Sequence, residues 1–243
     1  MRMRKKKHGR ERLSACSEFI AELPELPMSD PSALFGRGGA PVFLEIGAGK
    51  GGFASKMAKR HSEACYFAME RVSDCVVLAA EGAKNMEGGA PDNLKFIVDT
   101  ADNLTKIFAP ESVDAIFLNF SDPWSKKGYA KRRLTHRRYL AVYMNLLKAG
   151  GVLRFKTDND GLFDFSLEEL SAVGLPTVKL TRDLHSSEYA EGNIMTEYET
   201  AFSSQGVKIN MLEVIKPCGF SLPIPDDLKP DRRDYRRSAD EAD

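Results

Sequence analysis

Short apolar runs recur along the chain in a pattern that suits a buried sheet. The runs predict strands at 42–46, 65–69, 94–98, 113–120 and 152–156. Strands that are apolar on both faces are typical of a parallel sheet covered by helices on both sides. Two further strands, predicted at 178–184 and 198–204, would bring the sheet to seven strands.

Between these runs, apolar residues recur every three or four positions, which predicts helices. Val72, Cys75, Val76 and Ala79 mark one such helical face. The predicted helices span residues 53–61, 71–86, 139–147 and 162–174. Helices that alternate with buried strands indicate an α/β fold, with a mostly parallel sheet between two helical layers.

Nearly every predicted strand ends in an acidic residue. Glu45, Glu70, Asp99, Asp122 and Asp158 stand at or just past the ends of the five apolar strands. In open α/β sheets, ligands bind outside the carboxyl ends of the strands. We therefore expect these carboxylates to gather at one rim of the sheet and to form a ligand site there.

The segment EIGAGKGG, at the end of the first strand, satisfies the pattern GxGxxG at Gly47, Gly49 and Gly52. That pattern alone also admits a nicotinamide or flavin nucleotide, with Glu70 placed for a ribose hydroxyl. However, an acid two residues before the first glycine would repel a pyrophosphate, and Lys50 is followed by glycine where a phosphate-binding P-loop has Ser or Thr. These features favour S-adenosylmethionine, which carries an adenosine and positive charge but no phosphate. A simple glycine turn between strand and helix is the alternative.

The fourth strand leads into NFSDPWSKKGYAKRRLTHRR, residues 119–138, where Asp122, Pro123 and the single tryptophan, Trp124, precede a dense run of lysines and arginines. The order resembles the polar-Pro-aromatic motifs of amino-group methyltransferases, in which a polar side chain holds a base edge and the aromatic ring stacks on the base. Such stacking contributes about 1–3 kcal/mol per base, and basic side chains would grip phosphates without reading sequence. The alternative is a solvated loop in which Trp124 is a packing anchor.

Composition narrows the classes of function. Because 35 basic and 35 acidic residues cancel, the net charge gives no argument for nucleic acid. The charge is segregated, however, with seven basic residues and one acid between Arg2 and Arg12. The cysteines and histidines are scattered without metal-ligand spacing, so we predict no metal site and free thiols in a reducing compartment. No stretch has the character of a signal peptide or a membrane span, so a soluble cytoplasmic protein is expected.

Five motifs, in their order along the chain, closely resemble those of the bacterial tRNA (guanine-N7-)-methyltransferases: EIGAGKGGF, YFAMER, NFSDPWSKKGYAKRRL, RFKTDNDGLF and GNIMTEYE. The block around Asp-Pro-Trp and the TEYE block are specific to that family, whereas the glycine loop indicates only a methyltransferase. The resemblance runs from the N-terminal MRMRKKK to about residue 205. It implies a Rossmann-like class I methyltransferase fold whose last strand is antiparallel. It also implies methyl transfer from S-adenosylmethionine to N7 of a guanine in the tRNA variable loop, forming 7-methylguanosine.

The same resemblance implies candidate site residues. The methyl donor S-adenosyl-L-methionine, with no metal, would be held by Glu45, Gly47, Gly49, Glu70, Asp99 and Asp122. The match is imperfect at VDTADNL, where Thr100 and Asp102 compete with Asp99. The substrate base would be held by Lys126, Asp158, Thr196, Glu197, Tyr198 and Glu199, and RNA would contact Gly128, Tyr129, Ala130, Lys131, Arg132 and Arg133.

Guanine chemistry makes Asp122 the candidate catalytic residue. N7 carries an in-plane lone pair and no proton at neutral pH, so no base has to act before it attacks a sulfonium methyl. Alignment of the reactants contributes about 7–11 kcal/mol in favourable cases, and a carboxylate would stabilise the positive charge that develops on the purine. Two structural alternatives stay open: Asp158 as a helix N-cap, and Glu197 and Glu199 as the exposed face of an edge strand.

We expect three regions along the chain. These are a basic N-terminal arm and helix over residues 1–36, a methyltransferase domain over 37–205, and a C-terminal extension over 206–243 that ends in a flexible tail. The expected partner is tRNA, with no membrane and no obligate protein partner. The rival classes are an oxidoreductase that uses the same glycine loop, a non-catalytic RNA-binding module, and a methyltransferase for another base or amine. The choice of N7 rests on the family resemblance.

Overall fold

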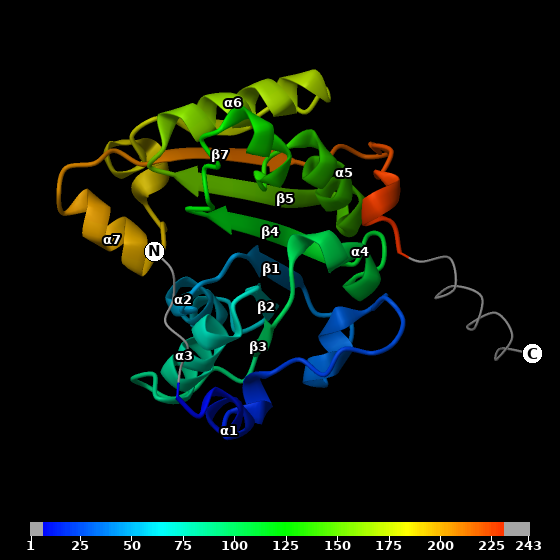
Figure 1. Ribbon diagram of the computed structural model, residues 1–243, viewed down its shortest axis with the longest axis vertical. Coiled ribbons are helices and arrows are strands. Elements are labelled where there is room, and N and C mark those ends of the chain that lie inside the picture. The colour runs from blue at the N-terminus through cyan, green and yellow to red at the C-terminus, as the bar shows by residue number, and fades with distance from the viewer. Residues whose placement is uncertain (1–6, 231–243) are drawn as a thin grey trace, which may run out of the picture.

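The computed structural model describes residues 7–230, which contain a seven-stranded sheet (Figure 1). The strands are β1 Val42–Ile46, β2 Cys65–Met69, β3 Leu94–Ile97, β4 Val113–Asn119, β5 Leu147–Thr157, β6 Lys179–Thr181 and β7 Asn210–Ile215. Their spatial order is β3-β2-β1-β4-β5-β7-β6. Strands β1 to β5 are parallel, and β7 runs antiparallel to β5 and β6. The predicted mostly parallel sheet with a reversed last strand is confirmed.

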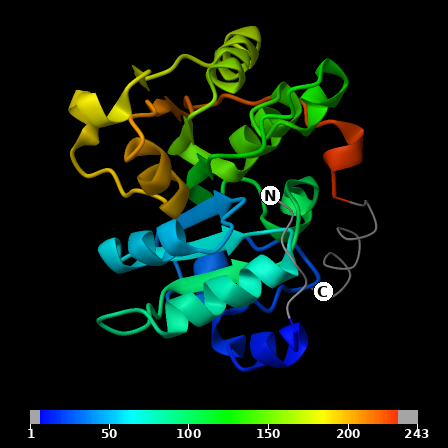
Figure 2. The same ribbon diagram turned by 60° about the vertical axis from the view of Figure 1, so that its left-hand side comes forward.

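Helices cover both faces of this sheet. On one face, α2 Gly52–Arg60 and α3 Ser73–Lys84 lie side by side, and the short helix α1 Gly9–Ser14 packs against α3 (Figure 2). The other face is covered by α4 Leu104–Ile107, α5 Arg137–Leu146 and α6 Asp160–Ala172. Helix α7 Glu197–Ser203 lies at the end of the sheet toward which β4 and β5 point (Figure 1).

The two-residue period of each strand separates two apolar cores. Leu44 and Ile46 of β1 pack with α4, α5 and α6, whereas Phe43 packs on the side of α2 and α3. In β4, Phe117 belongs to the core beneath α2 and α3. Because successive side chains of a strand point to opposite faces, Glu45 lies on the α2 face and Ile46 on the other.

The strand predicted at 198–204 is wrong, because these residues belong largely to α7. The Thr196 hydroxyl accepts a hydrogen bond from the Glu199 backbone N–H at 2.9 Å, and the Glu199 carboxylate accepts one from the Thr196 N–H at 3.4 Å. This reciprocal capping box satisfies two donors at the start of the helix. The seventh strand is instead β7, an apolar run that lies beyond residue 205, the expected end of the domain.

The basic N-terminal stretch falls only partly within the described residues. Residues 1–6, with Arg2 and its basic neighbours, lie outside them, as does the tail after residue 230. Arg12, at the end of the stretch, donates two hydrogen bonds to the carboxylate of Glu81 in α3, at 2.7 and 2.6 Å. The Arg12 guanidinium therefore fastens α1 to the domain.

Candidate active site

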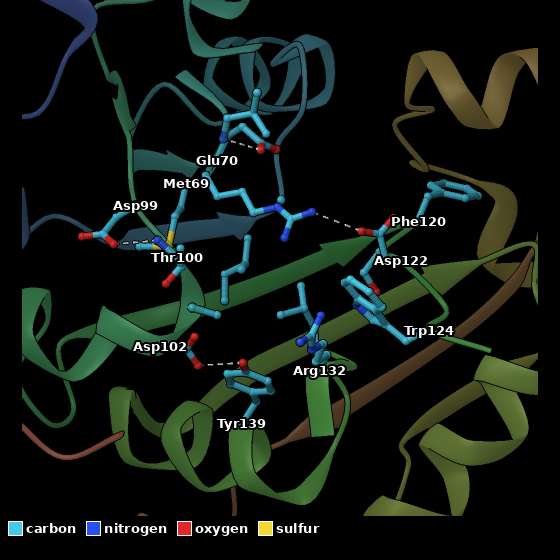
Figure 3. A pocket seen from close by; sticks show the side chains of 17 residues that line it. Met69, Glu70, Asp99, Thr100, Asp102, Phe120, Asp122, Trp124, Arg132 and Tyr139 are labelled. Atoms are coloured by element: carbon cyan, nitrogen blue, oxygen red, sulfur yellow. Dashed lines mark hydrogen bonds and ion pairs between the residues drawn. The ribbon is translucent and has the colours of Figure 1, made fainter. Parts of the chain in front are cut away.

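A cavity of about 610 Å³ opens at the carboxyl ends of β1 to β4 (Figure 3). Its wall includes Gly47 after β1, Glu70 after β2, Asp99 after β3 and Asp122 after β4. Acidic side chains from three strand ends, together with the first glycine of the loop, thus meet around one hollow. Asp102 also lines the wall, so the cavity carries four carboxylates.

The glycine loop is held by the end of β2. The Gly47 backbone N–H donates to the Met69 carbonyl at 2.8 Å. The Glu70 carboxylate accepts from the Gly49 N–H at 3.1 Å and from the Val72 N–H at 2.9 Å. Because a carboxylate offers about four lone-pair sites, Glu70 can anchor the loop and still accept from hydroxyl groups of a ligand.

Glu45 does not line the cavity. It is 2% exposed, and its Oε1 accepts a hydrogen bond from Asn119 at 2.8 Å, while Oε2 has no hydrogen-bond partner among the described residues. Burial raises the pKa of Glu45 to about 7, against the opposing effects of Asn119 and Lys156. The carboxyl group therefore lies behind the glycine loop, on the α2 face, and not among the acids of the wall.

The three candidates after β3, Asp99, Thr100 and Asp102, all line the cavity. The two acids among them have different hydrogen-bond partners. Asp99 Oδ1 accepts from the Thr100 N–H at 2.7 Å and from the Asn103 side-chain amide at 2.8 Å. Asp102 accepts from the Tyr139 hydroxyl at 2.8 Å (Figure 3). Asp99 lies closest to the strand end and Asp102 faces α5, so a ligand would meet the two acids from different sides.

The acid–proline–aromatic turn forms another part of the wall. Phe120, Asp122 and Trp124 all line the cavity. The Asp122 side chain is 67% exposed, and one of its oxygens lies 3.5 Å from the guanidinium of Arg71, which follows Glu70 (Figure 3). An exposed ion pair of this kind is weak, so Asp122 is open to competition by a ligand.

Known proteins with similar sequences assign the family. Residues 39–212 match the family model described as "Putative methyltransferase". The tRNA (guanine-N(7)-)-methyltransferase of Lachnoclostridium phytofermentans is 43% identical over 212 residues, which cover 87% of this chain and 97% of the relative. That of Halalkalibacterium halodurans is 40% identical over 213 residues, covering 88% and 94%. This chain belongs to the tRNA (guanine-N(7)-)-methyltransferase family.

Solved methyltransferase structures share the fold at much lower sequence identity. An antibiotic-related methyltransferase superposes with a TM-score of 0.54 at 19% identity, covering 76% of this chain and 90% of that one. The 16S rRNA methyltransferase KamB gives a TM-score of 0.54 at 11% identity, covering 88% and 95%. The expected Rossmann-like methyltransferase fold is confirmed.

The basic segment after the turn contributes to the rim of the cavity of this family member. Residues Lys127–Arg132 form a short 3-10 helix, and Lys126, Gly128, Tyr129, Lys131 and Arg132 are exposed. The Arg132 guanidinium lies 5.1 Å from the Trp124 ring centroid and 4.8 Å from that of Tyr129, and it lines the cavity. Ala130 and Arg133 are half-buried.

Asp158 lies outside the cavity wall and is not the helix cap. Asn159 is the N-cap of α6, and its side chain accepts from the Leu162 N–H at 2.8 Å. The half-buried Asp158 instead lies near α7, where its charge adds to the effect of burial in raising the pKa of Tyr198. The N-cap alternative for Asp158 is therefore wrong.

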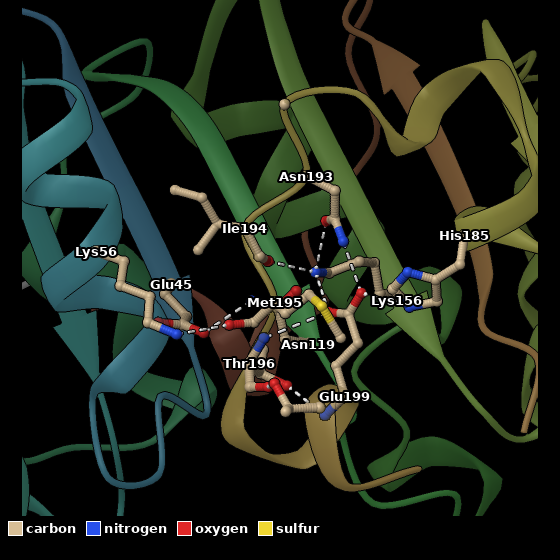
Figure 4. A network of polar contacts seen from close by, with 12 residues as sticks. Glu45, Lys56, Asn119, Lys156, His185, Asn193, Ile194, Met195, Thr196 and Glu199 are labelled. Atoms are coloured by element: carbon tan, nitrogen blue, oxygen red, sulfur yellow. Dashed lines mark hydrogen bonds and ion pairs between the residues drawn. The ribbon is translucent and has the colours of Figure 1, made fainter. Parts of the chain in front are cut away.

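In the TEYE segment, Glu199 is buried and Tyr198 is exposed. Glu199 is fully buried and bonded to Lys156 and Asn193 (Figure 4). Tyr198 is 49% exposed, stacks on Phe202 at 4.3 Å between ring centroids, and lies 5.3 Å from Phe120 at the cavity wall. Tyr198 therefore links α7 to the cavity wall through its ring contact with Phe120.

Glu197, at the start of α7, lies beside the glycine loop. A methyl group added at Gly52 would stand 3.2 Å from a Glu197 carboxylate oxygen. This contact brings α7 against the first turn of α2.

Two polar residues that contact the predicted site residues were not predicted from the sequence. Arg71 directly follows Glu70 and reaches Asp122 across the cavity. Asn119, at the end of β4, bonds to Glu45. Both stand at or just past strand ends, and that position is the signal that could have found them.

Within residues 7–230, no group of three or more His, Cys, Asp or Glu side chains is placed to hold a metal ion. In that same range, no helix has the length and apolar character needed to cross a membrane.

Proposed function

We propose that this chain transfers a methyl group from S-adenosyl-L-methionine to N7 of a guanine in tRNA, forming 7-methylguanosine. The observation that carries the proposal is the acid-lined cavity that ends on Asp122 and Trp124, directly beside the basic segment. The relatives named above, at 40–43% identity, are tRNA (guanine-N(7)-)-methyltransferases. By resemblance, the target guanine lies in the variable loop, and the enzyme would act in the cytoplasm.

The cavity suits a cationic donor of the size of S-adenosylmethionine. Its volume of about 610 Å³ falls in the range of about 300–1,000 Å³ usual for small-molecule sites. Four carboxylates against the two arginines of the wall, Arg71 and Arg132, leave it net negative, which favours positive charge over phosphate. Glu70 would accept from the ribose hydroxyls, and Asp99 would accept from the adenine amino group.

The donor supplies a methyl group on a positively charged sulfur. The guanine N7 lone pair forms the new bond to carbon, and the sulfur–carbon bond breaks with its electrons kept by sulfur. The purine acquires the positive charge that the sulfur loses, and no proton has to move. Because Asp122 lies at the cavity wall with most of its side chain exposed, it would accept from guanine N1–H and the amino group and stabilise that charge.

Trp124 and the basic segment would hold the RNA. The Trp124 ring lines the cavity, so it would stack on the target base. Exposed Lys126, Lys131 and Arg132 would bind phosphates around the cavity, positioning the RNA without reading its sequence.

The test is product identification. The purified full chain is incubated with tRNA that lacks 7-methylguanosine and with S-adenosylmethionine labelled in the methyl group, and the tRNA is then digested to nucleosides. We expect the label in 7-methylguanosine. Label in another nucleoside would redirect the proposal to a different base, and no label in any nucleoside would overturn it.

A further inference from the structure

The turn that carries Asp122 and Trp124 has an unfavourable backbone at both ends. Phe120 has a φ of 52° and Trp124 a φ of 40°, and neither residue is glycine. Bulky residues rarely adopt this left-handed region. Such a conformation is unfavourable and persists only when the surroundings impose it. Some contact in the fold must therefore hold this turn.

Arg133 contacts the Trp124 end of this turn. Its Nε donates to the Pro123 carbonyl at 3.0 Å, and its Nη2 donates to the Trp124 carbonyl at 3.1 Å. The guanidinium also lies over the ring of Phe165 in α6, 4.3 Å from the centroid. One planar group thus ties two consecutive carbonyls of the turn to a helix on the sheet.

The adjacent arginine is used differently. Arg132 is exposed, lies over the rings of Trp124 and Tyr129, and lines the cavity. Arg133 is half-buried, and two of its donors are already bonded to the backbone of the turn. Of the two neighbours, only Arg132 therefore presents its charge to the cavity.

We propose that Arg133 is a positioning residue, which holds the turn 120–124 so that Asp122 and Trp124 face the cavity, and not a phosphate contact. The role in methyl transfer rests on the function proposed above. A lysine could not replace it, because an ammonium group lacks the planar fork that reaches two carbonyls while stacking on a ring.

The test uses Arg133→Lys and reads the turn directly through Trp124, the single tryptophan of the chain. In the absence of substrates, we expect a red shift of tryptophan emission and stronger quenching by acrylamide, because the turn loosens. With tRNA and S-adenosylmethionine, we expect kcat to fall between about 10-fold and 100-fold, as small misplacements of reacting groups do. The salt dependence of tRNA binding should stay unchanged, since no phosphate contact is lost.

The matched control is Arg154→Lys. Arg154 is also half-buried and donates two hydrogen bonds through Nε and Nη2, but to Glu213 on β7. Its replacement should leave the tryptophan emission and kcat unchanged. A second variant, Phe165→Leu, removes the ring beneath Arg133 without changing charge, and we expect a smaller change in emission and kcat in the same direction.

The proposal is overturned if Arg133→Lys keeps the wild-type emission, quenching and kcat but binds tRNA with a reduced salt slope. If Arg133→Lys does not fold, Phe165→Leu decides, and wild-type emission and kcat in that variant would overturn the proposal. The emission and quenching are measured without substrate. They therefore test whether Arg133 holds the turn even if the wild-type chain transfers no methyl group. Failure of the proposed function is therefore distinguishable from failure of this inference.

Discussion

The ammonium group of Lys156 lies 2.6 Å from the carboxylate of Glu199, and both side chains are shielded from solvent, at 1% and 0% exposure (Figure 4). Lys156 also donates to the Asn193 side chain and to the Ile194 carbonyl, at 3.1 and 3.0 Å. Burial lowers the pKa of Lys156, and the charge of Glu199 opposes that shift. The pair joins the end of β5 to α7.

Glu199→Ala should therefore act mainly on stability. Removing one member of a buried ion pair leaves the other charge uncompensated and costs about 3–5 kcal/mol. We expect a loss of that size in the free energy of unfolding, measured by urea denaturation. The double variant Lys156→Met/Glu199→Leu should be less destabilised than Glu199→Ala, because no lone charge remains. Unaltered stability of Glu199→Ala together with weakened tRNA binding would instead return Glu199 to the substrate-binding role implied by resemblance.

The buried carboxyl group of Glu45 predicts a defined pH dependence. Its pKa is raised from 4.5 to about 7, so the folded state binds this proton more tightly than the unfolded state does. The contribution to stability is complete below about pH 4.5 and is lost as the pH rises toward 7. Glu45→Gln, which stays neutral, should match the wild type near pH 4.5 and exceed its unfolding free energy above pH 7, by on the order of 3 kcal/mol.

The measurement is denaturation of both proteins across that pH range, with the difference in unfolding free energy plotted against pH. Groups other than Glu45 titrate equally in the two proteins and cancel in the difference. A difference that does not vary with pH would show that Glu45 is ionised throughout.

Asp122→Ala should separate activity from stability. The side chain is 67% exposed and its ion-pair partner Arg71 is 59% exposed, so the unfolding free energy should change by less than about 0.5 kcal/mol. Loss of one preorganised charge-stabilising group costs about 10²–10³ in kcat, and we expect a fall of that size in methyl transfer. Asp92→Ala, which removes an exposed acid of another ion pair, is the control and should keep full turnover. Near-normal turnover of Asp122→Ala would remove Asp122 from the mechanism.

Replacing Lys131 and Arg132 together with glutamine should weaken tRNA binding and its dependence on salt. Both side chains are exposed beside the cavity. Each lost phosphate contact lowers the slope of log affinity against log salt concentration by about 0.7–0.9. Binding titrations at several salt concentrations measure that slope, with Lys208→Gln, an exposed lysine paired with Asp183, as the control. An unchanged slope would favour the alternative of a merely solvated charged loop.

The apolar strands were predictable because both of their faces are buried. In β1 and β2 nearly every side chain is buried, so both strands appear as continuous apolar runs. The segment of α7 was ambiguous, because Tyr198, Thr200 and Phe202, residue types that are common in strands, stand at alternate positions. Its start at Thr196 and Glu199 does carry the capping-box signal, so local chemistry decided where periodicity misled.

The candidate site was predictable at the strand ends and in the segment that follows β4, where Trp124 and Arg132 also line the cavity. Glu70, Asp99 and Asp122 meet at one cavity because parallel strands bring their carboxyl ends to one edge. Glu45 does not line this cavity, because it lies one residue before the end of β1 and its side chain points to the α2 face of the sheet. The pair of Lys156 and Glu199 joins residues 43 positions apart, and no local pattern reports such a contact.

The glycine loop offers a final test of local geometry. Gly51 has a φ of 73°, and a methyl group added there would stand 2.8 Å from the Ala79 side chain and 2.8 Å from the ring of Phe96. Gly49 has a φ of 56°, with no atom within 4 Å of such a methyl group. Both alanine variants carry the left-handed strain of about 1–2 kcal/mol, but only Gly51→Ala also overpacks the contact of the loop with α3 and β3.

Gly51→Ala should therefore lower the unfolding free energy by about 1–3 kcal/mol more than Gly49→Ala does. Urea denaturation of the two variants measures the difference, and the shared strain cancels in it. Since Gly49 donates its N–H to Glu70, Gly49→Ala should act more on S-adenosylmethionine affinity, measured by calorimetric titration, than on stability. Equal destabilisation by the two variants would mean that the loop relaxes away from α3, and that close packing does not fix the position of the loop.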